Sequence, residues 1–115
     1  MNTRPITSRN PEQKIQNAII KRLRLLGWVV QRMIGNSFQF GVPDLYITHR
    51  EYGPRWVEVK LPNMNGSRWT SAQLENFPKF QANGSPIWVL TGASDSEISK
   101  LFLSSNLWEY MKKKG

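Results

Sequence analysis

Apolar residues recur every three or four positions near the start of the chain, which is the spacing of one face of a helix. This face consists of Ile15, Ile19, Leu23 and Leu26. Asn10 is suited to cap the helix, Pro11 to occupy its first position and Gly27 to end it. Residues 1–9 lack such a period, so we interpret them as a flexible basic arm that precedes a single domain over residues 10–115.

Shorter runs rich in β-branched and aromatic residues indicate strands. They are expected over residues 28–34, 44–49, 55–61 and 86–91. Arg50 to Pro54 is rich in turn-forming residues, so the second and third runs should pair as a hairpin. The fourth run is apolar throughout and is expected to be a central, buried strand.

A capping box indicates a second long helix, because Thr70 is followed three residues later by Gln73. Pro78 should kink this helix or end its regular pattern. Ser94 and Glu97 form another such box and predict a helix near the end of the chain. A last apolar stripe is expected to pack within the molecule or against a second copy, and consists of Leu107, Trp108 and Met111.

Charged residues interrupt two of the predicted strands. Side chains alternate between the faces of a strand, so Glu58 and Lys60 share one face, opposite to Val57 and Val59. If the hairpin forms, the carboxylate of Asp44 can approach that of Glu58. Two carboxylates and a lysine at strand ends are suited to a Mg²⁺ site with an adjacent cation. A structural ion network is the alternative explanation.

The composition limits the classes of function. The sequence has 115 residues and a formal net charge of +8. The charge favours a polyanionic partner, nucleic acid before a membrane surface, although solubility alone would also explain it. There is no cysteine and His49 is the single histidine, which excludes disulfides, cysteine nucleophiles and the usual zinc sites. Lacking a membrane span and a signal peptide, the protein is expected in the cytoplasm, in a bacterial host cell or near the nucleoid.

Residues 41–47 and 56–60 together resemble the core motif of the PD-(D/E)xK nucleases, with Pro-Asp at 43–44 and Glu-x-Lys at 58–60. The sequence Gly-Val-Pro-Asp-Leu, followed by Glu-Val-Lys, is similar in particular to the virus-type replication-repair nuclease (VRR-NUC) branch, which is close to Holliday-junction resolvases. The resemblance covers residues 10–91 and implies an α/β, restriction-endonuclease-like fold with a mixed sheet flanked by helices. The αβββαβ order expected from periodicity and caps agrees with it.

The resemblance also implies a metal site. Mg²⁺, or Mn²⁺ in its place, would be held by Asp44, Glu58 and the Val59 carbonyl, and Glu12 would assist from the first helix. An acid in the first turn of a helix is also favoured by the helix dipole, so Glu12 has a second, purely structural explanation. Lys60 would position or deprotonate the attacking water.

Gln73 resembles a glutamine that related nucleases place near the metal, a role compatible with capping its helix. Basic and aromatic residues outside this motif are candidates for DNA contact. Lys14 and Lys21 lie on the polar side of the first helix, where they would contact phosphate or only solvent. Arg32 would point toward substrate or protect a sheet edge.

Arg68 and Trp69 follow a loop and would clamp a phosphate or stack on an unpaired base, unless Trp69 packs on the helix that follows. The expected function is therefore metal-dependent hydrolysis of DNA. A chain without a separate sequence-reading element favours recognition of DNA shape, and symmetric cutting of a four-way junction needs two active sites. We expect a homodimeric Holliday-junction resolvase acting on branched DNA, of viral or mobile-element origin. The alternatives are a flap, fork or restriction-like nuclease, and a non-catalytic nucleic-acid-binding module.

Overall fold

The computed structural model describes residues 11–33, 41–64 and 67–111. The predicted arm over residues 1–9 lies outside this part of the chain, as do the cap at Asn10 and the loop that leads toward Asp44. The elements in chain order are α1 (Pro11–Leu25), β1 (Val29–Arg32), β2 (Leu45–His49), β3 (Gly53–Val59), the short 3-10 helix η2 (Pro62–Met64), α2 (Ser71–Ala82), β4 (Ile87–Leu90), α3 (Asp95–Ile98), the 3-10 helix η3 (Ser99–Phe102) and α4 (Leu107–Tyr110).

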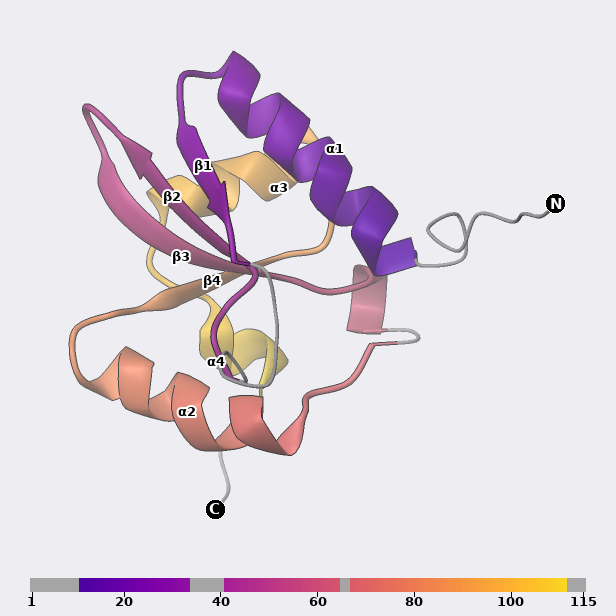
Figure 1. The fold of residues 1–115 in the computed structure, drawn as a ribbon, viewed down its shortest axis with the longest axis vertical. Coiled ribbons are helices and arrows are strands. Elements are labelled where there is room, and N and C mark those ends of the chain that lie inside the picture. The colour runs from indigo at the N-terminus through magenta and orange to yellow at the C-terminus, as the bar shows by residue number, and fades with distance from the viewer. Residues whose placement is uncertain (1–10, 34–40, 65–66, 112–115) are drawn as a thin grey trace, which may run out of the picture.

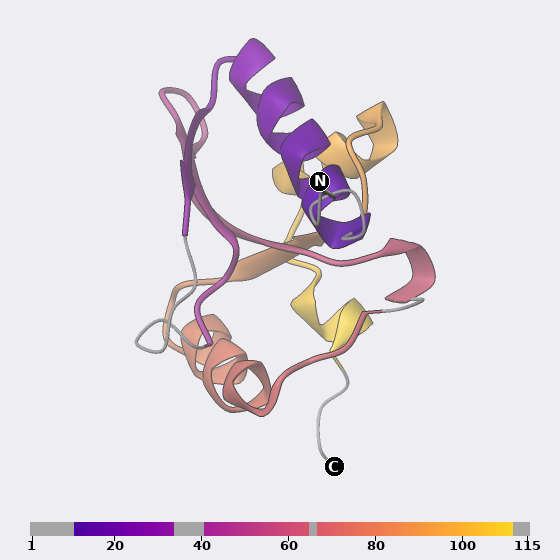
Figure 2. The same ribbon diagram turned by 45° about the vertical axis from the view of Figure 1, so that its right-hand side comes forward.

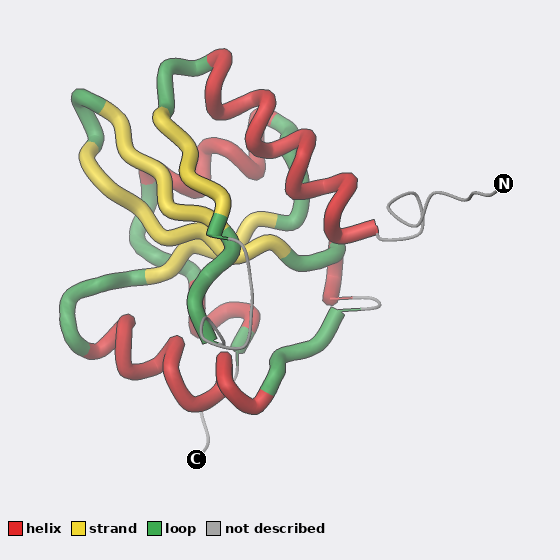
Figure 3. The backbone as a smooth tube through the Cα atoms, viewed as in Figure 1, coloured by secondary structure: helices red, strands yellow, loops and turns green. Residues whose placement is uncertain are grey.

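The strands form a mixed four-stranded sheet in the order β1-β2-β3-β4. Strand β1 pairs antiparallel with β2, and β2 pairs antiparallel with β3. Helix α2 then crosses over, so that β4 lies parallel to β3 (Figure 3). Helices cover both faces of this sheet, α1 and α3 on one side and α2 and α4 on the other (Figures 1 and 2). The predicted αβββαβ order and the mixed sheet flanked by helices are confirmed.

Each face of the sheet has its own apolar core. Under α1 the core is the larger of the two and includes Ile19, Leu23, Leu45, Ile47, Val57 and Leu90. Under α2 and α4 it includes Phe77, Ile87, Val89, Leu107 and Met111. The last apolar stripe therefore packs within the molecule through Leu107 and Met111.

Helix α1 ends where its sequence predicts, at a glycine. The N–H of Gly27 donates to the carbonyl of Arg24, and the N–H of Trp28 donates to that of Leu23. This pair of bonds is a Schellman motif, which needs a left-handed residue, and Gly27 has a φ of +95°. The chain reverses direction at this turn, so β1 joins the sheet beside α1. Leu26 lies outside the helix and is 46% exposed.

Pro78 does not end α2, which continues to Ala82. Pro78 was expected to kink the helix or to end its regular pattern, and the second of these does not occur; the capping box at the start of the same helix is confirmed. Phe77 next to the proline is fully buried, and Phe80 packs on the same core. Packing on both sides of Pro78 stabilises the helix despite the backbone hydrogen bond that a proline cannot donate.

The prediction that the last strand is central was also wrong. Strand β4 is buried along its whole length, as expected, but it lies at an edge of the described sheet. Side chains replace the missing neighbour. The amide of Asn106 accepts from the N–H of Val89 at 2.7 Å and donates to its carbonyl at 3.0 Å. Gln81 accepts from the N–H of Ile87, Ser105 donates to the carbonyl of Ile87, and Glu97 accepts from the N–H of Thr91.

This edge predicts a stability effect at Asn106. Asn106→Ala leaves two buried backbone groups of Val89 without a partner, and each such loss costs about 1–3 kcal/mol. We expect the free energy of unfolding, measured by urea denaturation, to fall by about 3 kcal/mol. Ser104→Ala, at an exposed position of the same segment, is the control and should leave it unchanged. Equal stability of the two variants would show that the Asn106 bonds contribute nothing.

Candidate active site

Asp44 and Glu58 face each other at one end of the sheet. The register of β2 and β3 places Leu45 opposite Val57, so Asp44, just before β2, lies opposite Glu58. The N–H of Asp44 donates to Oε1 of Glu58 at 3.2 Å, and the N–H of Val59 donates to Oδ2 of Asp44 at 2.8 Å. Each carboxylate is thus held by the backbone of the segment that carries the other.

Both carboxylates are withdrawn from solvent, and this changes their acidity. Glu58 is only 2% exposed. Burial raises the pKa of Glu58 well above its usual range, and the nearby charge of Asp44 raises it further. Burial is also the largest cause of the raised pKa of Asp44; the charge of Glu12 adds to it, while the N–H of Val59 acts in the opposite direction. Ionising this pair is therefore costly unless a cation lies near.

Lys60 supplies one positive charge beside the pair. It is 3% exposed and lies just beyond the end of β3. Its Nζ is 3.5 Å from Oε2 of Glu58, donates to the carbonyl of Arg68 at 2.7 Å and lies 4.4 Å from the centre of the Trp69 ring. The ammonium is therefore fixed in position as well as buried.

Gln73 joins the start of α2 to the same carboxylate. Its Oε1 accepts from the N–H of Thr70, which completes the capping box, and its Nε2 donates to Oε2 of Glu58 at 2.9 Å. The predicted capping contact is thus present, and the same side chain also reaches Glu58. The helix cap fixes the orientation of the amide, so its N–H points at Glu58.

Glu12 approaches the pair from α1, but its contact is with another residue. The hydroxyl of Ser67 donates to Oε2 of Glu12, and the same oxygen of Ser67 accepts from the N–H of Leu61 at 2.8 Å. Glu12 therefore ties α1 to the segment that follows β3. The sequence analysis did not single out Ser67, because a serine in a loop has no pattern that distinguishes it.

The donor set is suited to a divalent metal without being a complete cage. Across residues 11–33, 41–64 and 67–111, no three His, Cys, Asp or Glu side chains gather closely enough to hold an ion by themselves. Mg²⁺, however, is commonly bound by one or two carboxylates together with waters and substrate phosphate oxygens. The buried pair Asp44 and Glu58, with raised pKa values that a cation would offset, fits such a site.

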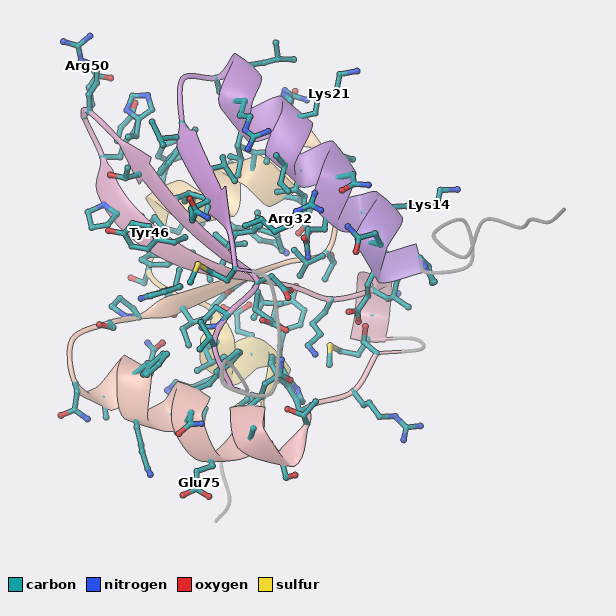
Figure 4. The ribbon with its side chains drawn as sticks, in the orientation of Figure 1. Lys14, Lys21, Arg32, Tyr46, Arg50 and Glu75 are labelled. Carbon is teal, nitrogen blue, oxygen red and sulfur yellow. The ribbon has the colours of Figure 1, made fainter. Side chains whose placement is uncertain are left out.

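A basic depression lies between α1 and β1. Arg32 lies opposite Leu45 in the sheet, and its guanidinium donates to Oδ1 of Asn17 on α1 at 2.7 Å. The depression between α1 and β1 has a volume of about 440 Å³ and is lined by Asn17, Ile20, Lys21, Arg24, Leu25 and Arg32. Figure 4 shows Arg32 between these elements and Lys21 projecting outward from α1, with Lys14 nearer its start.

Trp69 and Arg68 lie on the other side of Lys60 from Glu58. The indole of Trp69 contacts the Phe77 ring edge-on at 5.8 Å and donates to the carbonyl of Tyr110 at 3.2 Å. Packing on α2, the alternative weighed for this residue, accounts for these contacts. The side chain of Arg68 is exposed, whereas its carbonyl holds Lys60.

Comparison with known proteins agrees with this architecture. A solved structure described as a VRR_NUC domain is similar with a TM-score of 0.61 and 24% sequence identity, covering 81% of this chain and 95% of the other. The chain has the fold of a VRR_NUC domain. The fold implied by the sequence resemblance is thereby confirmed. Protein-family models and curated proteins give no match.

Lys60 should contribute to the stability of this VRR_NUC fold, independently of any catalytic role. Lys60→Met fills a similar volume but leaves Glu58 buried without its cation, and breaking a buried pair in this way costs about 3–5 kcal/mol. We expect a loss of that order in urea denaturation at neutral pH. Lys79→Met, at an exposed ion pair on α2, is the matched control and should change stability by less than about 0.5 kcal/mol. A small loss at Lys60 would contradict the buried pairing.

The raised pKa values also predict a pH dependence. The folded protein holds the carboxyl protons of Asp44 and Glu58 more tightly than the unfolded chain, so its stability should fall as pH rises from the ordinary carboxyl range through the raised values. Asp44→Asn removes one acid and the charge that acts on Glu58. In EDTA the variant should melt at a higher temperature than the wild type at neutral pH, with a smaller difference in acid.

The exposed variant Glu75→Gln serves as the control for this pH series, and it should follow the wild type throughout. A wild-type protein whose stability rises through the same pH range would contradict the assignment.

Proposed function

We propose that the protein is a metal-dependent DNA endonuclease that hydrolyses phosphodiester bonds. The observation that carries this proposal is the buried pair Asp44 and Glu58, crossed by backbone hydrogen bonds and flanked by Lys60. Burying two acids and a lysine lowers the stability of a fold, so the arrangement favours a functional role for these residues. The neighbouring VRR_NUC domain, which shares this fold, supports a nuclease.

The metal we propose is Mg²⁺, with Mn²⁺ able to replace it. Asp44, Glu58 and the carbonyl of Val59 would hold it, and it would supply a water of lowered pKa and positive charge near the scissile phosphate. Lys60 would orient the attacking water and offset negative charge that develops on the phosphate. Gln73 would keep the carboxylate of Glu58 in place. Glu12 would contribute through Ser67 or a bound water rather than as a direct ligand.

The DNA backbone would approach along the basic depression. Its cations start at Arg32, which is next to Asp44 in the sheet, and continue along α1 to Lys21. Lys14 lies on the same helix and Arg68 is exposed near Lys60. These residues would contact the phosphate backbone of DNA that crosses the site.

For the substrate we propose branched DNA, with a four-way junction cut by a homodimer as the first candidate. Exposed apolar side chains near the turn after α1 support self-association: Leu25 is 76% exposed and Val29 68%. Leu25 and Val29 lie on either side of the turn between α1 and β1. Val29 begins β1 and pairs with the end of β2 that leads into the β2–β3 turn. Asp44 lies at the other end of β2, so this apolar surface is away from it. A dimer formed there would leave both active sites open to DNA. A flap or replication fork is the second candidate substrate.

Cleavage of end-labelled junction, flap and linear duplex tests the proposal. We expect cutting with Mg²⁺ or Mn²⁺, none in EDTA, and a loss of at least about a hundredfold in Asp44→Asn. Asp44→Asn suits this purpose because its amide can still accept from the N–H of Val59. Glu75→Gln, whose side chain points away from the sheet (Figure 4), should cut normally.

Each outcome of this assay has a separate meaning. Paired, symmetric nicks on the junction would support the resolvase. Preferential cutting of flaps would keep the chemistry and replace the substrate. Tight binding without cleavage in either metal would overturn the enzyme and leave a nucleic-acid-binding module.

The proposed backbone path predicts a change in salt dependence. Lys21→Ala should weaken the binding of Asp44→Asn protein to DNA and reduce the slope of log affinity against log salt by about 0.9, the value for one lost phosphate contact. Lys79→Ala, an exposed lysine on the outer helix α2, should leave the slope unchanged. Fluorescence anisotropy over a salt series measures both. Equal slopes for the two variants would place the DNA elsewhere.

A further inference from the structure

A second cavity lies on the molecule outside the carboxylate site, and three aromatic residues contribute to its walls. It has a volume of about 190 Å³ and is lined chiefly by Tyr46, Arg55, Trp56, Ser85, Pro86 and Trp88. The residues come from β2, β3, the start of β4 and the turn that precedes it. None of the described residues that line it is acidic, and Arg55 is the one that carries a formal charge.

The cavity wall is held rigid by its own contacts. The rings of Tyr46 and Trp56 meet edge-on at 5.1 Å, and Trp56 stacks on Phe80 of α2 at 6.3 Å. The guanidinium of Arg55 lies 4.9 Å from the centre of the Trp88 ring and donates to the carbonyl of Leu101. Of the three aromatic residues, Tyr46 is the one exposed to solvent, at 36%. Figure 4 shows it projecting from the sheet above α2.

The register of the sheet places one end of this cavity, at Tyr46 and Trp56, near the carboxylate pair. Tyr46 pairs with Trp56 across β2 and β3, and each lies two residues along its segment from Asp44 and Glu58 respectively. Residues two apart in an extended chain point to the same side, about 7 Å apart. The aromatic pair and the carboxylate pair are thus successive rungs of one hairpin, on the face that α2 covers.

We infer that this cavity binds one unpaired DNA base next to the scissile phosphate. The inference deepens the proposed function and rests on its claim that the substrate is DNA. The ring of Tyr46 is open to solvent and rests against Trp56, which is fixed in place. Such a ring gives a π-surface on which a base can stack, and stacking of this kind does not depend on base identity. A paired base has both faces covered by its neighbours, so only an unpaired one can enter.

A base site at this position would affect the choice of substrate. A nuclease with a base site next to its cleavage site should prefer DNA with an unpaired nucleotide near the cut, such as a flap or an opened junction arm, over a continuous duplex.

The test is a binding titration of the full chain in EDTA, where no cleavage occurs. Two duplexes carry the fluorescent base 2-aminopurine, one in a short single-stranded overhang and one at a paired position. We expect the wild type to bind the overhang more tightly and to quench its fluorescence. Tyr46→Ala should weaken binding of the overhang by about tenfold and leave the paired probe unchanged. Tyr46→Phe, which keeps the ring, should bind as the wild type does.

Tyr52→Ala is the matched control, because Tyr52 is 44% exposed and lies at the hairpin tip, outside the cavity. Its affinities should equal those of the wild type. Ser85→Trp fills the cavity from the turn without removing a ring, so it should also lose the overhang selectively, and it decides the question if Tyr46→Ala does not fold. Equal losses on both probes, or no loss on either, would overturn the inference.

The two proposals fail separately. If junction, flap and duplex all stay uncut with Mg²⁺ and Mn²⁺, but Tyr46→Ala selectively loses the overhang, the nuclease is wrong and the base site stands. If DNA is cut and Tyr46→Ala shows no selective loss, the base site is wrong and the nuclease stands.

Discussion

The crossed hydrogen bonds from the N–H of Asp44 to Glu58 and from the N–H of Val59 to Asp44 are the constraint on which the rest of the site depends. They hold two acids away from solvent, and burial raises the pKa of both; the charge of Asp44 raises that of Glu58 further, and the charge of Glu12 raises that of Asp44 further. The surrounding groups then reduce this cost. Lys60 brings a charge, and Gln73 brings an oriented N–H. A divalent ion would complete the compensation, which gives a physical reason for the protein to bind one.

The site also joins parts of the fold that have separate cores. Glu12 on α1 reaches the segment after β3 through Ser67, and Gln73 on α2 reaches Glu58 directly. The two helices lie on opposite faces of the sheet and converge at the one end where the acids lie. A small domain can in this way assemble a site from both of its layers, without an added loop or subunit.

Local patterns in the sequence predicted much of this arrangement. Alternation along β3 placed Glu58 and Lys60 on one face, and the capping box at Thr70 placed the start of α2. The features that were missed depend on distant residues. Pro78 stays helical because of packing around it, β4 is buried at an edge because Asn106 covers it, and Glu12 meets a serine far along the chain. The indole of Trp69 could not be assigned for the same reason, since Phe77 and Tyr110 decide its position.

The covering of β4 limits how this molecule can assemble. Backbone groups that would recruit a neighbouring strand are already bonded to the side chains of Gln81, Glu97, Ser105 and Asn106. Two copies therefore cannot extend one another's sheet across β4, because doing so would require those four side chains to release their bonds. Side chains also reach the strand at the opposite edge, where Arg24 donates to the carbonyl of Val30 and Gln31 donates to that of Arg32. The described sheet thus protects its edge strands with its own side chains rather than with further strands.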